Sequence, residues 1–252
     1  MNDTERRMRE QFRLDTNCPV EMERQRIVMI NPSKKLEGSR TFADISTFFR
    51  AIIYRGELYL MCDDRILDWA REEFSLAAPE WFCKFDNLRK IDQKLQEYGY
   101  KIKDTHIYFD PDPEFEGYDY ECPYQLEWLD QEKIMEIKGN PFKNALMYQN
   151  DCPDRMAVAA LNRQGERVAV AGVSSDGKNL WQIGIDVLQE YRGKGLAVYL
   201  TTLIKEKVLE MGRIPFYGTS ESHAISRTVA VRSGFRPAWC EIYSTCDTKS
   251  EL

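Results

Sequence analysis

The feature that most constrains the fold is a short turn between an apolar strand pattern and an amphipathic helix pattern. It reads Arg192-Gly193-Lys194-Gly195-Leu196-Ala197 and follows the apolar stretch at residues 180–188. Glycine has no side chain to keep a bulky anion away from the backbone. The first amide groups of a helix lack partners within the helix and carry partial positive charge, and Arg192 and Lys194 add full charges. The turn therefore predicts a site for a pyrophosphate.

The same turn excludes two common nucleotide-binding motifs. No G-x-x-x-x-G-K-[ST] frame fits it, and a G-x-G-x-x-G fingerprint is absent. Nucleotide hydrolysis and hydride transfer therefore lose support. The alternative for the turn is a surface loop whose glycines only end secondary structure.

The elements around the turn follow a defined order. Alternating apolar residues predict an antiparallel meander of three strands, and a stripe of apolar residues from Leu196 to Met211 predicts a helix that begins near Arg192 and ends at Gly212. The full predicted order is strand 124–129, helix 131–138 with a stop at 139–141, strands 156–161, 167–173 and 180–188, the helix, strand 214–218, helix 222–232 and strand 236–243.

This order resembles the GNAT superfamily of N-acetyltransferases over roughly residues 124–243. Two segments carry the resemblance: residues 189–197 match the family's pyrophosphate loop, and in residues 223–235 Ser226 and Gly234-Phe235 stand at the family's spacing. The resemblance implies an α+β fold with a central mixed, mostly antiparallel sheet flanked by helices. It also implies acetyl-CoA as cosubstrate. The scattered cysteines, which include no C-x-x-C pair, suggest no metal site.

The resemblance further implies how the coenzyme is held. Strand 180–187 would diverge from strand 214–218, and an amide group at about Val187 would polarise the acetyl carbonyl, as an oxyanion hole does. The residues expected to contact the coenzyme are Ile185 and Val187 along the pantetheine arm, Ser226 beside it, and Arg192, Gly193, Lys194, Gly195, Leu196 and Ala197 around the pyrophosphate.

Attack by an amine needs a base, because amines are mostly protonated at neutral pH. The candidate catalytic residues are Asp186, Glu221 and His223. For each there is a structural alternative: Asp186 pointing to solvent, Glu221 capping a helix, and His223 holding structure or the coenzyme, since the family often has Asn at its position.

Ala230 departs from the family pattern. It occupies the position where many members have a tyrosine that protonates the departing thiolate. Tyr199, Tyr217 or Tyr243 would replace that tyrosine if the fold brought one of them near the sulfur. Otherwise water protonates the thiolate, or the protein binds the coenzyme without fast turnover.

The acidic stretch at residues 110–121 divides the chain. It holds six carboxylates, two prolines and no basic residue, so it predicts either a solvated linker or an acidic rim that attracts a cationic substrate. We therefore expect an N-terminal α+β accessory domain at 1–117 and the GNAT-like domain at 118–252.

The N-terminal half predicts a strand at 26–30, a hairpin at 51–61 turning at Arg55-Gly56-Glu57, helices at 66–74 and 88–98, and a strand at 102–109. The second of these helices ends at Tyr98-Gly99-Tyr100, which is similar to the helix end at Ser233-Gly234-Phe235. The N-terminal half is either a degenerate GNAT-like copy or an unrelated α+β cap.

Bulk properties restrict the partners. A net charge of -6 argues against nucleic acid, the charged N-terminus argues against a signal or membrane segment, and seven scattered cysteines suggest reduced side chains. We expect a cytoplasmic enzyme that acetylates a primary amine on a small molecule. A non-catalytic acyl-CoA sensor and a protein acetyltransferase are the alternatives, and the sequence leaves a homo-oligomer open.

Overall fold

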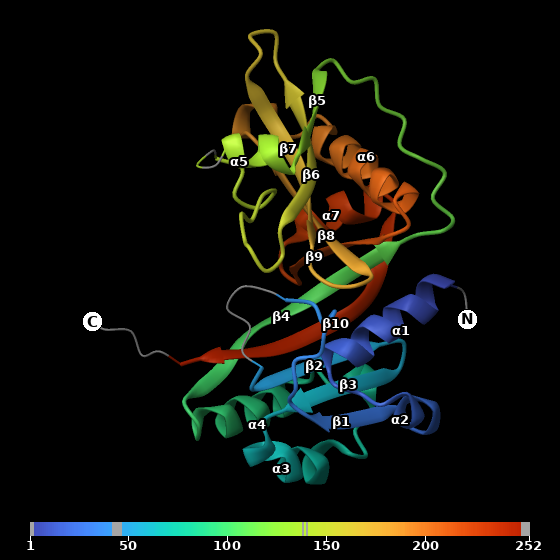
Figure 1. Cartoon of the computed structure of the whole chain (residues 1–252), viewed down its shortest axis with the longest axis vertical. Helices are drawn as coiled ribbons and strands as arrows, with labels where there is room; N and C mark the ends of the chain where they lie inside the picture. Colours follow the sequence, from blue (N-terminus) through green and yellow to red (C-terminus); the bar gives the residue numbers. More distant parts are fainter. Residues whose placement is uncertain (1–2, 42–46, 138, 140, 248–252) are drawn as a thin grey trace. The chain divides into compact units, whose positions relative to one another are not determined.

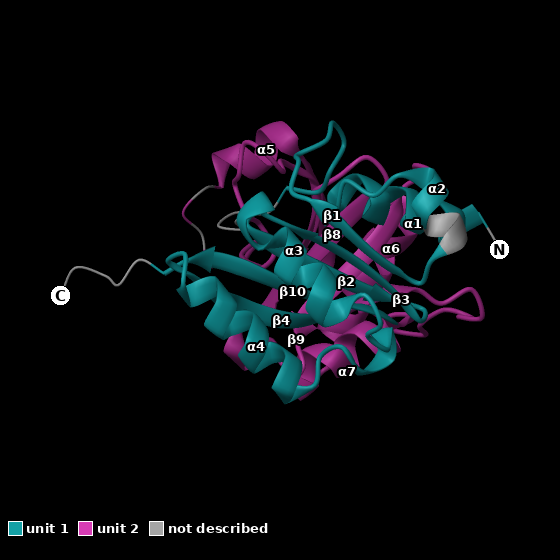
Figure 2. Ribbon diagram, turned by 90° about the horizontal axis from the view of Figure 1, so that it is seen from below, with its two compact units in different colours: residues 1–107, 238–252 teal, residues 108–237 magenta. Residues whose placement is uncertain are grey.

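The computed structural model describes residues 3–41, 47–137, 139 and 141–247, and it divides the chain into two compact units (Figure 2). Unit 1 consists of residues 1–107 and 238–252, and unit 2 of residues 108–237. This differs from the predicted division at 117/118 in two ways. The boundary lies earlier, and the C-terminal residues belong with the N-terminal unit.

Strand pairing explains why the C-terminal residues join unit 1. Strand β10 (Phe235–Cys246) pairs antiparallel with β2 (Phe49–Tyr54), in a register from Trp239↔Tyr54 to Tyr243↔Arg50. A local change in composition can indicate a linker, but it does not show which strands far apart in the sequence pair with each other. The acidic stretch was therefore an insufficient guide to the boundary.

Unit 1 is built on the strand order β1-β3-β2-β10, with β1 parallel and β2 antiparallel to β3 (Figure 1). The predicted hairpin is confirmed, because Arg55 and Gly56 both have positive φ, 48° and 77°, as a type I′ turn requires. The remaining elements are α1 (Asp3–Asp15), α2 (Val20–Gln25), β1 (Val28–Pro32), β3 (Glu57–Cys62), α3 (Asp64–Phe74), the 3-10 helix η1 (Pro79–Trp81), α4 (Phe85–Gln96) and β4 (Tyr100–Pro111), which continues into unit 2.

Helices α3 and α4 confirm the two helices expected from apolar spacing, whereas α1 and α2 were not predicted. The buried residues of α1 are Met8, Gln11, Phe12 and Asp15, which follow the i, i+3, i+4, i+7 pattern of one helix face. Two of the four are polar, so a count of apolar residues does not detect this face.

A cluster of four buried charges includes Asp15, the last residue of α1. Arg40 pairs with Asp15 at 2.5 Å and with Glu241 at 2.5 Å, and Arg50 pairs with Glu241 at 2.8 Å. The indole N–H of Trp239 also donates to Glu241, at 2.7 Å. Burial raises the pKa of Glu241, but the two arginines outweigh it and hold that pKa at about 2. The carboxylate is therefore charged and fully paired at neutral pH.

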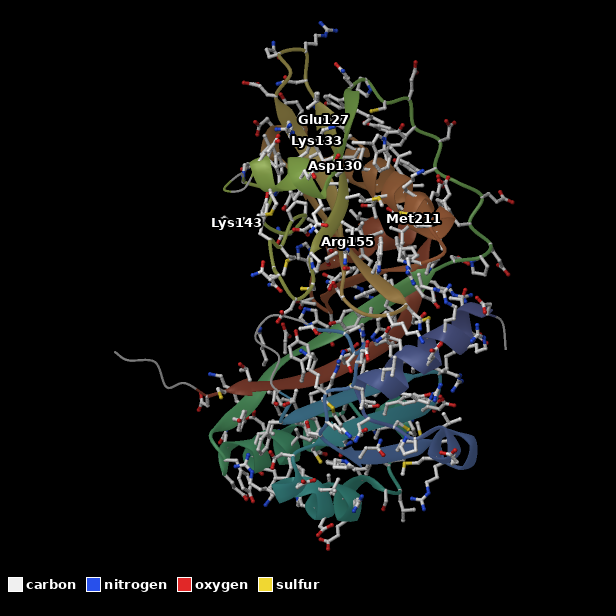
Figure 3. The ribbon with its side chains drawn as sticks, in the orientation of Figure 1. Glu127, Asp130, Lys133, Lys143, Arg155 and Met211 are labelled. Atoms are coloured by element: carbon white, nitrogen blue, oxygen red, sulfur yellow. The ribbon has the colours of Figure 1, made fainter. Side chains whose placement is uncertain are left out.

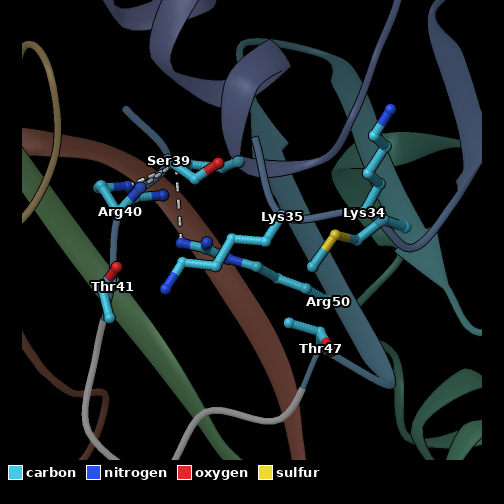
Figure 4. A pocket seen from close by; sticks show the side chains of 9 residues that line it. Lys34, Lys35, Ser39, Arg40, Thr41, Thr47 and Arg50 are labelled. Carbon is cyan, nitrogen blue, oxygen red and sulfur yellow. Dashed lines mark hydrogen bonds and ion pairs between the residues drawn. The ribbon is translucent and has the colours of Figure 1, made fainter. Parts of the chain in front are cut away.

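A cavity of about 80 Å³ borders this cluster (Figure 4). Four of its nine lining residues are basic and one is acidic, so the cavity carries a net positive charge. The lining residues are Asp15, Lys34, Lys35, Ser39, Arg40, Thr41, Thr47, Arg50 and Met61.

Unit 2 contains a sheet in the order β9-β8-β7-β6-β5, in which the β8–β9 pair is parallel and the other pairs are antiparallel. The predicted mixed, mostly antiparallel sheet with flanking helices is thus confirmed (Figure 1). Its elements are β5 (Gln125–Asp130), α5 (Gln131–Glu136), β6 (Asp154–Leu161), β7 (Arg167–Ser175), β8 (Leu180–Val187), the 3-10 helix η2 (Gln189–Tyr191), α6 (Leu196–Glu210), β9 (Ile214–Ser220) and α7 (Ala224–Arg232).

The predicted elements of unit 2 match these bounds closely, with one notable shift. Helix α6 begins at Leu196 rather than near Arg192, because η2 and a glycine turn precede it. Lys138 and Asn140, in the predicted end of the helix now called α5, lie outside the described residues.

The acidic stretch packs onto unit 2, so the prediction of a solvated linker is wrong for its aromatic residues. We call residues 112–121 the strap. The N–H of Asp112 donates to the carbonyl of Gly234 at 2.9 Å, and the ammonium of Lys205 lies 3.9 Å from the centre of the Phe115 ring. Burial lowers the pKa of Lys205 to about 8. The strap is therefore held at two points, against Lys205 of α6 and against Gly234 after α7.

We expect Glu241→Gln to destabilise the protein by about 3–5 kcal/mol at neutral pH, because it leaves two buried arginines without their shared carboxylate. The measurement is urea unfolding. Glu210→Gln, which changes an exposed pair with Lys207 on α6, is the control and should cost less than about 1 kcal/mol.

The pH dependence has a defined sign. The pKa of Glu241 is lower in the folded chain, so its contribution is fully present above about pH 4.5 and is lost as the pH falls towards about 2. The unfolding free energy of Glu241→Gln should fall less steeply across this window. Equal slopes for both proteins would contradict the assignment.

Candidate functional site

Strands β8 and β9 pair over only part of their length. Their parallel register runs from Leu180↔Ile214 to Ile183↔Tyr217, and no pairing between them follows, although β8 continues to Val187 and β9 to Ser220. On its other side β8 stays paired with β7 as far as Val187. The two strands therefore diverge, and one backbone edge of residues 184–187 is open.

The open edge presents the backbone groups of Ile185 and Val187. The N–H of Leu188 donates to Val168 on β7 at 2.9 Å, and backbone groups of successive strand residues point in opposite directions. The groups of Val187 and Ile185 accordingly point away from β7. An extended ligand lying in the divergence could form strand-like hydrogen bonds with them.

The glycine loop follows directly. Gly193 and Gly195 have φ of 76° and 82°, the left-handed region that side chains other than glycine's disfavour. Helix α6 then begins at Leu196 with no side-chain cap on its N-terminus. Leu196 is buried and anchors this end, whereas the first amide groups of the helix, including that of Ala197, have no intrahelical acceptor. The loop thus offers a concentrated set of amide donors.

Two basic residues lie in this loop, and both are exposed. The guanidinium of Arg192 donates from Nε to the carbonyl of Val187 at 2.8 Å, which ties the loop to the end of β8. The Lys194 ammonium lies 3.5 Å from the carbonyl of Glu190 and 5.8 Å from the centre of the Tyr191 ring. Both add positive charge beside the amide donors.

The start of α7 brings together three residues near the divergence. His223 is the N-cap, and its Nδ1 accepts a hydrogen bond from the backbone N–H of Ser226 at 3.1 Å. The Ser226 hydroxyl lies 2.9 Å from that of Tyr217, the last paired residue of β9. Burial raises the pKa of Tyr217, so its hydroxyl stays protonated at neutral pH. The structure thus gives His223 a capping role.

Asp186 is engaged in a structural network. Its carboxylate accepts hydrogen bonds from the backbone N–H of Asn144 at 2.7 Å, from the Asn144 side chain at 2.7 Å and from the backbone N–H of Ala145 at 3.0 Å. Asn144 and Ala145 lie close against β7 and β8. A Cβ at Gly184 would collide with the carbonyl of Asn144, and a Cβ at Gly172 would collide with that of Ala145. Asp186 does not point to free solvent, and its role as a base stays a prediction.

Glu221 is exposed and lies just before α7. Its backbone carbonyl accepts a hydrogen bond from the Arg227 side chain of α7 at 3.1 Å. Its role as a base also stays a prediction.

The three tyrosines proposed in place of Ala230 lie in different surroundings. Ala230 itself is fully buried on α7. Tyr199 packs against Tyr120 of the strap with ring centres 4.9 Å apart, and Tyr243 lies in unit 1, 3.4 Å from His106. Of the three, Tyr217 is the one on a strand that borders the divergence. Its pairing with Ser226 was not predicted, because nothing in the spacing of the two residues signals it.

An open hollow of about 720 Å³ lies elsewhere on unit 2, and none of the predicted site residues lines it. It is lined by Asp130, Gln131, Glu132 and Met135 at the start of α5. The Asp130 carboxylate caps that helix by accepting from the N–H of Lys133 at 3.0 Å (Figure 3). This hollow is separate from the diverging strands and the loop.

The described residues show neither a metal-binding group nor a membrane-spanning helix. They contain no group of three or more His, Cys, Asp and Glu side chains placed to hold a metal ion. Nor do they contain a helix that is both long and apolar enough to cross a membrane.

Unit 2 combines three features. They are its strand order, a parallel strand pair that diverges, and a glycine loop that leads into a helix. This is the arrangement that the resemblance to the GNAT superfamily led us to expect of residues 124–243. The predicted α+β class with a mixed, mostly antiparallel sheet is confirmed. The roles of the individual residues expected to hold the coenzyme stay predictions.

Comparison with solved structures gives distant similarities. A putative GNAT-family acetyltransferase of Novosphingobium aromaticivorans is 18% identical, with a TM-score of 0.45 over 58% of this chain and 66% of that one. A GCN5-related N-acetyltransferase-like protein of Streptococcus suis is 13% identical, with a TM-score of 0.49 over 95% and 99% of the two chains. A Drosophila protein is 13% identical, with a TM-score of 0.50 over 74% and 68%.

These similarities concern fold alone. The match to the Novosphingobium protein spans slightly less than two thirds of that protein. No protein-family model matches the sequence, and comparison with curated proteins finds no match.

The contacts of Asp186 lead to a test of its role. Asp186→Asn replaces one acceptor oxygen by a donor that faces N–H groups, so we expect a loss of about 1–3 kcal/mol in the free energy of unfolding. Urea unfolding measures it, with the exposed Asp151→Asn as control. An unchanged stability would contradict the structural role and leave Asp186 available as a base.

Proposed function

We propose that unit 2 is an acetyl-CoA-dependent N-acetyltransferase whose acceptor is a primary amine on a small molecule. The observation that carries the proposal is the divergence of β8 from β9 beyond Ile183 and Tyr217, with the glycine loop at its open end. An extended acyl-thioester arm fits a gap between two strands, and its pyrophosphate fits amide donors at a helix start.

The residues present suit this cosubstrate. The backbone groups of Ile185 and the amide of Val187 would hold the pantetheine arm, and the amide of Val187 would polarise the acetyl carbonyl. The carbonyl of Val187 is already bonded to Arg192. The amides of Gly193 to Ala197 would hold the pyrophosphate, aided by the charges of Arg192 and Lys194. Ser226 would lie beside the arm.

The reaction requires two proton movements. The amine nitrogen attacks the thioester carbonyl carbon, the C–S bond breaks, the nitrogen loses a proton and the sulfur gains one. Tyr217 is our candidate for the proton donor to sulfur, because its hydroxyl is protonated and borders the divergence. Glu221 and His223, at the start of α7, are the candidates for accepting the amine proton.

The acceptor class follows from charge. Exposed carboxylates on the strap, among them Glu116 and Asp119, lie in the same unit as the loop and favour a cationic acceptor over an anionic one. A protonated primary amine is such an acceptor. It must still lose its proton before attack.

A coenzyme-binding protein without turnover is the second candidate. Ala230 favours it, because a buried methyl group occupies the position where many GNAT enzymes have a proton-donating tyrosine. The two candidates share coenzyme binding and differ in catalysis, so two experiments separate them.

The first experiment measures acetyl-CoA binding by isothermal titration. Gly193→Glu should weaken binding at least ten-fold, because it places a negative charge in the loop, where no atom lies within 4 Å of the added Cβ. Gly212→Glu is the matched control: Gly212 has a similar φ of 68°, equally open space, and lies at the other end of α6. Failure of the wild-type protein to bind acetyl-CoA would reject both candidates.

The second experiment measures release of free thiol during incubation with acetyl-CoA and a panel of primary amines. Tyr217→Phe should lower kcat by about 100-fold while leaving coenzyme affinity within a factor of about two. Tyr191→Phe serves as a control for loss of a tyrosine hydroxyl. Tight binding by the wild type with no turnover on any amine would favour the non-catalytic candidate.

A further inference from the structure

The strap reaches the glycine loop through two tyrosines. A Cβ at Gly195 would lie 2.6 Å from the hydroxyl oxygen of Tyr118 and 3.1 Å from the ring of Tyr120. Both side chains therefore border the loop that offers amide donors to a phosphate group. Neither residue belongs to the part of the sequence that resembles the GNAT motifs.

The tyrosines form a row of rings beside the helix start. Tyr118 and Tyr120 stack with centres 5.9 Å apart and planes 15° from parallel, and Tyr120 packs against Tyr199 of α6. Both strap tyrosines are half-buried, whereas Asp119 and Glu121 between and after them are exposed. This alternation turns the rings towards the loop and the carboxylates away from it.

A cation completes the group. Arg232, at the end of α7, donates from Nη2 to the hydroxyl of Tyr118 at 3.3 Å, and its guanidinium lies 5.5 Å from the centre of that ring. Its side chain is exposed, so it can contact a ligand as well as the tyrosine. Guanidinium groups bind phosphate oxygens with paired hydrogen bonds.

The strap is fixed before any ligand arrives. Phe115 packs over the Lys205 ammonium and occupies the space beside Gly234, and the Asp112 amide is bonded to the Gly234 carbonyl. Anchored rings lose little freedom when they bind a ligand. The tyrosines therefore form a preorganised surface rather than a loose loop.

We propose that Tyr118, Tyr120 and Arg232 form a subsite for the nucleotide end of the coenzyme, in which the adenine ring packs on the tyrosines and Arg232 binds the ribose 3′-phosphate. The inference rests on the proposed function, since it assigns a role to the strap in holding the same cosubstrate. It makes the strap a determinant of specificity for coenzyme A over pantetheine carriers that lack the nucleotide.

The test compares two ligands by isothermal titration: acetyl-CoA, and acetyl-4′-phosphopantetheine, which lacks the nucleotide. Tyr120→Leu and Arg232→Gln should each weaken acetyl-CoA binding about ten-fold, the size expected for losing a stacked ring or a phosphate contact. Binding of acetyl-4′-phosphopantetheine should change less than two-fold. Arg227→Gln, also on α7, is the control for loss of an arginine.

Several outcomes would overturn the subsite. Equal weakening for both ligands would show damage to the loop, and tighter acetyl-CoA binding by the variants would show that the strap blocks the loop. Unchanged affinity for acetyl-CoA would show that the strap does not contact the nucleotide. If the wild-type protein bound neither ligand, the proposed function itself would fail. Retained phosphopantetheine binding also shows that a variant is folded.

Discussion

The candidate site depends on the point at which β8 and β9 stop pairing. On each strand the residue that follows the last β8–β9 pair is a glycine, Gly184 after Ile183 and Gly218 after Tyr217. Because a glycine has no side chain, each lies close to a different neighbour. A Cβ at Gly184 would collide with the backbone of Asn144, and a Cβ at Gly218 would lie 2.6 Å from the ring of Tyr108. The two strands are therefore packed against different partners where they part, and the gap between them follows from that packing.

The polar residues near this gap divide into those that build it and those that remain available for chemistry. The Asp186 carboxylate holds residues 144–145 in place, and the Arg192 side chain ties the loop to β8. His223 belongs to both groups, because its Nδ1 caps α7 while the residue stays a candidate for accepting the amine proton. Tyr217, by contrast, keeps a protonated hydroxyl beside Ser226. A side chain that its type alone marks as a catalytic candidate can thus have a structural role, because catalysis and structure use the same hydrogen-bonding groups.

The sequence predicted well those features that depend on neighbouring residues. Apolar periodicity located the meander, α3, α4 and α6, and the glycine pair located the loop. It failed where contacts join distant segments: β10 with β2, Asp186 with Asn144, and Tyr118 with the loop at Gly195. Such contacts leave no periodic signal. They depend on which surfaces the completed fold brings together, and residues 110–121 looked like a linker because their charges outnumber the few aromatic residues that pack.

The C-terminal part of β10 has a consequence for the order in which the chain completes its folding. Unit 2 is continuous in sequence, whereas unit 1 needs the residues from Ala238 on, which follow unit 2 in the sequence. Until they arrive, Arg40 and Arg50 lack the Glu241 carboxylate and β2 lacks its neighbour β10. On the ribosome, where domains form as the chain emerges, the second unit can finish before the first. The N-terminal unit is then the later one to complete, and until it does Asp15 is the carboxylate that faces both Arg40 and Arg50.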